Sequence, residues 1–355
     1  MAAVQTVRVA ASLPTYRQVP ETKYELDWAD LATLDLSIFD TPALIVPSYL
    51  LPSILIYSGF FYITNFGLSQ EAVDRQFAIG KELFQLPFSE KLKYRADLEN
   101  GGYNGYKLLG LRKVRPGVQD NTEIYNIPKF IPAFERPHPK IINVHREEIE
   151  SFARHINDEV VGKLLVLLAI VLELPENFFL EKHQSEEKSD CHLRYMKYHQ
   201  RTKEQNEALE NVWVKGHTDF GSLTLLFRQP VAVSQVRTPE GQWKHVKPYP
   251  GILTNGFLKS SIHRVVAPPP DQANIDRLGV LYFVRPEDNV VLNPIKSAVL
   301  EKLGYTKVKD EDAVGVTAGE WVKARVAKGA ARGKAPRSNV NEETIIGGKS
   351  VKYYD

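Results

Sequence analysis

The chain has 355 residues, 43% of them apolar, and a mean hydropathy of −0.28. This composition supports a buried core in one large domain or two small ones. Forty-five basic residues against forty-three acidic ones leave a net charge of +2, so no overall field favours nucleic acid or an anionic membrane as a partner. We therefore expect a globular protein whose partner is a small molecule.

The cysteine content and the N-terminal sequence indicate in which cellular compartment the protein is expected. The single cysteine, Cys191, excludes an intrachain disulfide framework and a metal site built from cysteines. The N-terminus lacks the continuous apolar segment of a secretory signal, while its lack of acidic residues leaves a transit peptide open; we expect a cytoplasmic protein. The uncharged residues 43–57 are too few to span about 30 Å of hydrocarbon and contain two prolines, so we expect no membrane anchor.

The first half of the chain predicts one buried strand and two helices. Aromatic and β-branched residues cluster at 58–67, which is typical of a buried strand. Apolar residues at helical spacing predict a helix over 70–86 and a longer one over 145–174, each ending before a proline. The glycine-rich segment 101–117 is expected to be a loop.

From Cys191 onward the pattern changes to short strands separated by turn residues. The expected strands are 192–199, 212–220, 222–227, 231–236, 242–246, 260–266 and 279–284. This spacing indicates a sandwich or barrel of antiparallel sheet. TAGE at 317–320 predicts a capping box that begins a helix over 321–330, and the polar, basic residues after it predict a mobile loop.

The segment VKGHTDFGSLTLLF, residues 214–227, places His217 and Asp219 two residues apart. In an extended strand such residues point to one side, so an imidazole and a carboxylate can reach one metal ion. His263 is the best third ligand because it lies in strand-like sequence, whereas the other histidines lie upstream, on helical sequence or beside turns. Two histidines and one carboxylate favour Fe(II) with open positions. A zinc hydrolase is the alternative, although the HExxH helix motif of zinc peptidases is absent.

Several segments together resemble the isopenicillin-N-synthase-like branch of the 2-oxoglutarate/Fe(II)-dependent oxygenases. They are SGFFYITNFG, LPFSEK, GHTDFGSLTLLF, NGFLKSSIHRVVAPP and RLGVLYFV, within a region of about residues 30–290. The resemblance implies an α+β fold with a double-stranded β-helix (jelly-roll) core flanked by N-terminal helices. We expect an N-terminal region over 1–180, a core over 181–300, and a C-terminal helix and basic tail over 301–355, packed as one unit.

The resemblance also implies the functional residues. It makes His217, Asp219 and His263 the iron ligands, and it makes Arg277 and Tyr198 the residues that hold the far carboxylate of 2-oxoglutarate. The serine that relatives carry two residues after this arginine is replaced by Gly279, so one hydroxyl donor is missing. Aromatic side chains are expected to line a pocket for a small, largely apolar or aromatic substrate. These are Tyr106, Tyr125, Phe220 and Phe283.

The implied reaction uses Fe(II), O2 and 2-oxoglutarate and releases succinate and CO2. It oxidises a small organic molecule, by default through hydroxylation, as in many enzymes of secondary metabolism. Gly279 favours an alternative, an oxidase of the same fold that does not use 2-oxoglutarate. A third reading is a catalytically silent binding protein, because the segment after Gly251 is shorter than in relatives and a strand of the core is expected to be missing there. Oligomeric state and substrate identity have no signal in the sequence.

Overall fold

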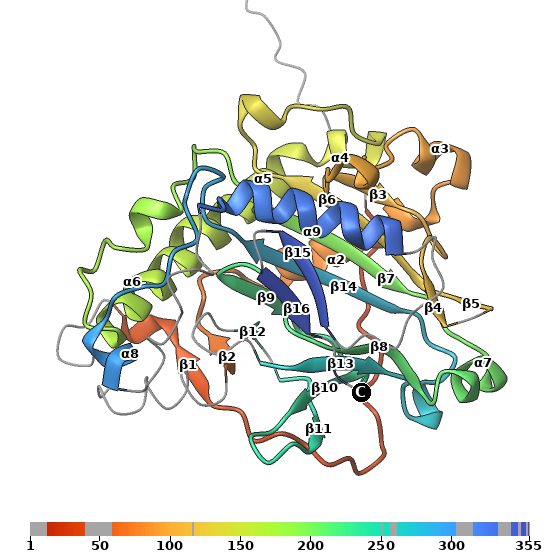
Figure 1. The fold of residues 1–355 in the computed structure, drawn as a ribbon. Coiled ribbons are helices and arrows are strands. Elements are labelled where there is room, and N and C mark those ends of the chain that lie inside the picture. Colours follow the sequence, from red (N-terminus) through yellow and green to blue (C-terminus); the bar gives the residue numbers. More distant parts are fainter. Residues whose placement is uncertain are drawn as a thin grey trace, which may run out of the picture.

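The computed structural model describes residues 13–39, 59–115, 117–249, 251–255, 261–302, 315–332, 342–346, 349–352 and 354. Two facing sheets form the core (Figure 1). The larger sheet has the order β1-β2-β12-β9-β14-β7-β6-β3 and the smaller has the order β11-β10-β13-β8. All pairs in these two sheets are antiparallel except β1 with β2. The predicted α+β fold with a jelly-roll core and N-terminal helices is confirmed.

The strands of the larger sheet come from both halves of the chain. They are β1 (Thr33–Asp35), β2 (Phe60–Thr64), β3 (Gly105–Lys107), β6 (Thr122–Pro128), β7 (His192–Tyr198), β9 (Leu223–Phe227), β12 (Ile252–Asn255) and β14 (Arg277–Val284). The smaller sheet contains β8 (Val212–His217), β10 (Ser234–Arg237), β11 (Trp243–His245) and β13 (His263–Val266). Two further pairs are β4 (Lys113–Arg115) with β5 (Val118–Gln119) and β15 (Glu342–Ile346) with β16 (Lys349–Lys352). The division into regions 1–180, 181–300 and 301–355 stays a prediction.

Helices cover the outer face of the larger sheet (Figure 1). The predicted helix at 70–86 is α2 (Gln70–Gln85), which Ser69 caps by accepting a hydrogen bond from Ala72 N at 3.1 Å. The predicted long helix is α5 (Arg146–His155) and α6 (Gly162–Val171), joined by the π-helical turn η6 (Ile156–Val161). The remaining helices of the described residues are α3 (Phe88–Leu92), α4 (Lys140–Val144), α7 (Lys203–Ala208), α8 (Ala298–Lys302), α9 (Ala318–Arg332), and the 3₁₀ turns η1 (Leu36–Ile38), η4 (Leu98–Asn100), η5 (Pro132–Phe134), η7 (Leu180–Lys182) and η8 (Pro270–Gln272).

Strand alternation decides which side chains face the space between the two sheets. On β14, Val280, Tyr282 and Val284 belong to the core beneath the helices. The alternate residues of the same strand line a cavity between the sheets, and they are Arg277, Gly279, Leu281 and Phe283. Because successive side chains point to opposite faces, the same strand stabilises the fold on one side and supplies polar groups on the other.

The glycine-rich segment 101–117 is not simply a loop, as its composition predicted. It contains β3, which pairs with β6 at the edge of the larger sheet, and β4. Gly105 begins β3 with φ of +109°, and a Cβ there would meet the carbonyl oxygen of Tyr94. The glycine is therefore required for a close approach of two backbone segments, which its loop-like surroundings concealed.

The short segment after Gly251 leads directly into β12. This strand pairs with β2 on one side, from Ile252↔Ile63 to Asn255↔Phe60, and with β9 on the other. The described sheet is therefore continuous at the position where the sequence indicated a missing strand. The residues that follow Gly251 form this ladder themselves.

The C-terminal helix begins at Ala318, three residues before the predicted start, directly after the predicted cap residue Thr317. Thr317 Oγ1 accepts from Glu320 N at 3.3 Å, while the Glu320 carboxylate accepts from Thr317 N at 2.9 Å, so the capping box is confirmed. The helix, α9, continues to Arg332, two residues beyond the predicted end. The rest of the predicted basic loop, and the uncharged residues 43–57, lie outside the described residues. Within the described ranges, no helix combines the length and the apolar character needed to cross a membrane.

Candidate metal centre

The structure brings His217, Asp219 and His263 together at the edge of the smaller sheet. His217 is the last residue of β8, and His263, the first residue of β13, lies opposite it in the antiparallel pair. Both imidazole Nε2 atoms lie 3.8 Å from Asp219 Oδ1, and the ring centroids are 4.3 Å apart. Asp219 lies just beyond the strand, whereas the sequence predicted it within the strand, and the turn still directs its carboxylate to the two rings.

Hydrogen bonds to the far side of each ring fix how the histidines can bind a metal. His217 Nδ1 lies 2.9 Å from the carbonyl oxygen of Lys215, and His263 Nδ1 lies 3.3 Å from that of Ser261. A carbonyl only accepts, so each Nδ1 acts as the donor in these contacts, and each Nε2, which faces Asp219, is the nitrogen that could bind a metal. Such outer contacts hold metal-ligating histidines in orientation.

The local electrostatics suit a cation. Burial, followed by the neighbouring His263, lowers the pKa of His217 to about 4, so this ring is neutral at physiological pH. Burial alone would raise the pKa of Asp219, but the nearby His263 and His217 hold it below its usual value. The three donor atoms lie within 4.8 Å of one another. Since metal–ligand bonds of about 2.1 Å separate ligands by about 3–4 Å, small side-chain adjustments suffice for one ion. The residues therefore fit Fe(II).

A cavity of about 130 Å³ lies beside this centre, between the two sheets. Arg277 and Tyr198 both line it and lie directly opposite each other on β14 and β7. The Arg277 guanidinium is 5.1 Å from the Tyr198 ring and donates to Ser234 Oγ at 3.2 Å. Among the described residues, the Arg277 guanidinium forms no ion pair, although it is buried. A buried cation without an anionic partner is costly, so an anionic ligand would stabilise it. Ser234 and Gln229, which also line the cavity, were not predicted.

A second cavity, of about 280 Å³, also reaches His217 and Asp219; it is called the substrate cleft below, after the role proposed for it. Phe220 and Phe283, which the family resemblance assigns to the substrate pocket, both line this cavity, and their role toward a substrate stays a prediction. Tyr106 and Tyr125 do not, since both are 1% exposed and belong to the core under the helices. Their strand neighbours line the cleft instead, namely Lys107, Thr122 and Ile124. The prediction identified the correct strands but the wrong face.

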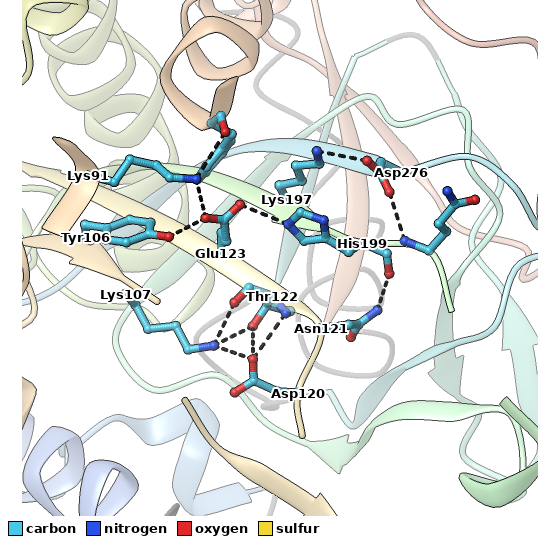
Figure 2. Close-up of polar contacts among 12 residues, drawn as sticks. Lys91, Tyr106, Lys107, Asp120, Asn121, Thr122, Glu123, Lys197, His199 and Asp276 are labelled. Atoms are coloured by element: carbon cyan, nitrogen blue, oxygen red, sulfur yellow. Dashed lines mark hydrogen bonds and ion pairs between the residues drawn. The ribbon is translucent and has the colours of Figure 1, made fainter. Parts of the chain in front are cut away.

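The two buried tyrosines have structural partners. Tyr125 Oη lies 2.8 Å from His138 Nδ1, while Tyr106 donates to the Glu123 carboxylate. Glu123 is the centre of a buried network on β6, in which Lys91 Nζ and His199 Nε2 lie 2.6 and 2.9 Å from its oxygens (Figure 2). This network lies on the face of β6 turned away from the cleft, which explains why Tyr106 cannot contact a substrate there.

Two family models match this chain. One is described as non-haem dioxygenase in morphine synthesis N-terminal and matches residues 50–147; the other is the 2OG-Fe(II) oxygenase superfamily and matches residues 189–286. The chain is 30% identical over 296 residues to the UPF0676 protein C1494.01 of Schizosaccharomyces pombe, covering 76% of this chain and 84% of that protein. It is 29% identical to the 2-oxoglutarate-Fe(II) type oxidoreductase hxnY of Emericella nidulans, covering 64% and 70%.

Solved structures show the same fold. A full-length Neurospora crassa protein in complex with alpha-KG matches with a TM-score of 0.71 at 22% identity, covering 88% of this chain and 100% of that one. The chain belongs to the 2OG-Fe(II) oxygenase superfamily, with the N-terminal module expected of the isopenicillin-N-synthase-like branch. It is a 2-oxoglutarate-dependent dioxygenase whose cofactors are Fe(II) and 2-oxoglutarate.

Proposed function

We propose that His217, Asp219 and His263 bind Fe(II), that Arg277 and Tyr198 bind the far carboxylate of 2-oxoglutarate, and that a small molecule in the substrate cleft is hydroxylated. One observation carries this assignment. The 130 Å³ cavity that contains Arg277 and the 280 Å³ cleft both have His217 and Asp219 in their walls. Cosubstrate and substrate can therefore approach the same metal from two directions.

Bound Fe(II) would supply the activation of O2, coupled to conversion of 2-oxoglutarate into succinate and CO2. The protein residues orient the reactants. The Nε2 atoms of both histidines and the Asp219 carboxylate would hold Fe(II) at a point that both cavities reach. Arg277 orients 2-oxoglutarate by binding the carboxylate that lies far from the metal, so the group that positions the cosubstrate is not the group that reacts. Phe220 and Phe283 form apolar walls that exclude water from the cleft.

Related structures support a small-molecule substrate. The Neurospora crassa protein has also been solved with alpha-KG and thymine, and JOX2 with 2OG, Fe and JA. Both share the fold with this chain at about 21% identity. This level of similarity supports a common fold, whereas the identity of the substrate depends on the residues that line the cleft.

Product formation tests the proposed function. Fe(II)-loaded protein is incubated with 2-oxoglutarate, O2 and a library of small molecules, and succinate is quantified. We expect 2-oxoglutarate-dependent succinate that a substrate stimulates and a chelator abolishes. Substrate oxidation without succinate would support the oxidase that does not use 2-oxoglutarate, and no turnover by folded, iron-loaded protein would support the silent binding protein.

Replacing Arg277 by glutamine should weaken 2-oxoglutarate binding about 10–100-fold, because a buried charge-assisted contact is lost. Fe(II) binding should be unchanged, because the guanidinium does not belong to the metal centre. Anaerobic calorimetric titration with 2-oxoglutarate measures the effect, and Arg146→Gln, at a surface arginine paired with Glu135, is the matched control. Equal affinity in Arg277→Gln and the control would contradict this role.

A further inference from the structure

The substrate cleft is strongly cationic. Its basic residues are Lys107, Arg112, Lys113, Arg194, Lys215, Arg285 and Arg325, and its carboxylates are Asp120 and Asp219. Asp120 is paired with Lys107 at 2.5 Å, and Asp219 belongs to the proposed metal centre. Among the residues that line the cleft, basic side chains therefore outnumber carboxylates.

Arg285 is the most deeply buried of these arginines, at 2% exposure. Its Nε has no hydrogen-bond partner among the described residues, and the nearest carboxylate oxygen, Asp190 Oδ2, is 3.9 Å away. Burial raises the pKa of Asp190 to about 7, which reduces the negative charge that this residue offers at neutral pH. Gly221, with φ of +113°, leaves the space that the guanidinium occupies, since a Cβ there would collide with it.

Arg194 presents a second buried guanidinium to the cleft. It is 6% exposed and is held by neutral partners, with Nε donating to Asn126 Oδ1 at 2.8 Å and Nη2 lying 3.2 Å from His192 Nε2. Burial lowers the pKa of His192 well below its usual value, so that ring carries no charge. The guanidinium carbons of Arg194 and Arg285 lie 4.3 and 5.2 Å from the same Phe283 ring. Two cations thus flank one aromatic wall.

The cosubstrate does not account for Arg285. Arg277 and Arg285 are eight residues apart along β14 and its immediate continuation, and both fall on the cavity side of the alternation. An extended strand rises about 3.3 Å per residue, which puts their backbones roughly 26 Å apart. One small keto acid held by Arg277 cannot also contact Arg285. The cosubstrate therefore leaves the role of Arg285 open.

We propose that the substrate is a small organic carboxylate whose carboxylate group binds Arg285 and Arg194, with its apolar body in the same cleft, which Phe220 and Phe283 line. This inference rests on the proposed function, because it places the substrate in the cleft that opens on the metal centre. Guanidinium groups bind planar carboxylates through paired hydrogen bonds, and a buried cation without a close anionic partner gains most from such a ligand. The expectation of an apolar or aromatic substrate is thereby narrowed to an anionic one.

Calorimetric titrations test this proposal with matched probes. Anaerobic protein saturated with Fe(II) and 2-oxoglutarate is titrated with phenylacetate and hexanoate, and separately with phenylacetamide and hexanamide, which have the same shape without the charge. We expect carboxylates to bind at least about 10-fold more tightly than amides, and Arg285→Gln and Arg194→Gln each to remove most of that preference. The surface variant Arg146→Gln should keep it.

The outcomes separate this proposal from the proposed function. Formation of the ferrous 2-oxoglutarate complex is checked first by its visible charge-transfer band; without that band the proposed function fails. With the band present, equal binding of acids and amides, absence of binding by either carboxylate, or full carboxylate preference in Arg285→Gln would overturn the carboxylate proposal.

A separate observation concerns Gln229 in the 130 Å³ cavity that Arg277 lines, which we call the cosubstrate cavity. Both its Oε1 and its Nε2 are shielded from solvent and have no hydrogen-bond partner among the described residues. A Cβ at position 279 would collide with Gln229 Nε2, so Gly279 is the residue that lets the amide enter the cavity. Arg277, two residues earlier on β14, lines the same cavity, and its Nε is also unpartnered in the described structure. A buried amide without partners is costly, which points to a ligand.

We infer that Gln229 Nε2 donates a hydrogen bond to the 2-oxoglutarate carboxylate held by Arg277. The amide then supplies the donor that the family resemblance assigns to a serine at position 279. Gln229 is a positioning residue for the cosubstrate. This inference rests on the proposed binding of 2-oxoglutarate by Arg277 and is independent of the charge of the substrate.

A double-variant cycle tests the role of Gln229. Gln229→Ala should raise the dissociation constant for 2-oxoglutarate about 10-fold in anaerobic titrations followed by the charge-transfer band. Gly279→Ser should also weaken binding, because its side chain meets the amide. Combining both changes should recover affinity, since the new hydroxyl fills the space left by the amide. Unchanged affinity in Gln229→Ala, or additive losses in the double variant, would overturn the inference; exposed Gln242→Ala is the control.

Discussion

Asp219→Ala is expected to abolish stoichiometric Fe(II) binding and to reduce 2-oxoglutarate turnover by more than about 100-fold. Loss of an outer partner of a metal ligand typically costs 10–100-fold, and here a ligand itself is removed. The two imidazoles would remain 4.3 Å apart at their centroids, without the carboxylate that both Nε2 atoms face at 3.8 Å. Anaerobic equilibrium dialysis followed by metal analysis measures binding, and succinate release measures turnover.

The control for this variant is Asp27→Ala, which removes an exposed carboxylate paired with Lys244. It should bind one Fe(II) per chain and turn over normally. His217→Ala and His263→Ala should behave like Asp219→Ala, because the three side chains act as one ligand set. If Asp219→Ala retained wild-type iron content and turnover, the assignment of the metal centre would be wrong.

The largest effect on stability is expected for Glu123. Its side chain is 5% exposed and pairs with Lys91, whose side chain is 8% exposed, at 2.6 Å (Figure 2). Glu123→Leu leaves the Lys91 ammonium with the carbonyl oxygen of Phe84 at 3.1 Å as its polar partner in the described structure. Removing one member of a buried ion pair typically costs 3–5 kcal/mol, and we expect a loss of about that size in the free energy of unfolding. Denaturant titration followed by circular dichroism measures it.

The pH dependence should change in the same variant. Burial disfavours the Glu123 carboxylate, but hydrogen bonds from His199, Lys91 and Tyr106 prevail and lower its pKa to about 2. A lowered acidic pKa stabilises the fold above the unfolded value of about 4.3, and this stabilisation is lost as pH falls from there toward 2. In Glu123→Leu, the free energy of unfolding should therefore depend less on pH over this acidic range.

Two comparisons control for loss of packing. Lys91→Met combined with Glu123→Leu should recover much of the stability, because an apolar pair often replaces a buried ion pair without loss. Glu99→Gln, at the surface pair with Arg95, should change unfolding little. Equal stability of Glu123→Leu and wild type would contradict the role assigned to the network.

The sequence predicted the fold well where periodicity was clear. Strand signals after Cys191 correspond to β7–β11, β13 and β14, and the helical spacing at 70–86 corresponds to α2. The glycine-rich strand β3 was missed because composition alone cannot reveal that Gly105 serves a close backbone contact. The break between α5 and α6 was also missed, since the apolar spacing continues through the π-helical turn η6.

In the candidate site as well, the residues that follow a clear strand pattern could be predicted, and those that depend on tertiary contacts could not. His217 and His263 could be predicted to meet because both follow strand-like patterns, and the structure places them opposite each other in one antiparallel pair. Tyr106 and Tyr125 were assigned to the cleft because an aromatic residue in a strand does not reveal which face it occupies. Gln229 and Arg285 carried no local motif, since their significance arises from a tertiary contact with Gly279 and from burial beside Phe220.

The most direct test of the proposed ferrous site is an anaerobic titration of the full chain with Fe(II) and then 2-oxoglutarate, followed by visible absorption. We expect a metal-to-ligand charge-transfer band that saturates at one equivalent of iron and is missing from Asp219→Ala. Properly folded wild-type protein that shows no such band, or an Asp219→Ala variant that shows it undiminished, would contradict the proposal that these three residues form the ferrous site.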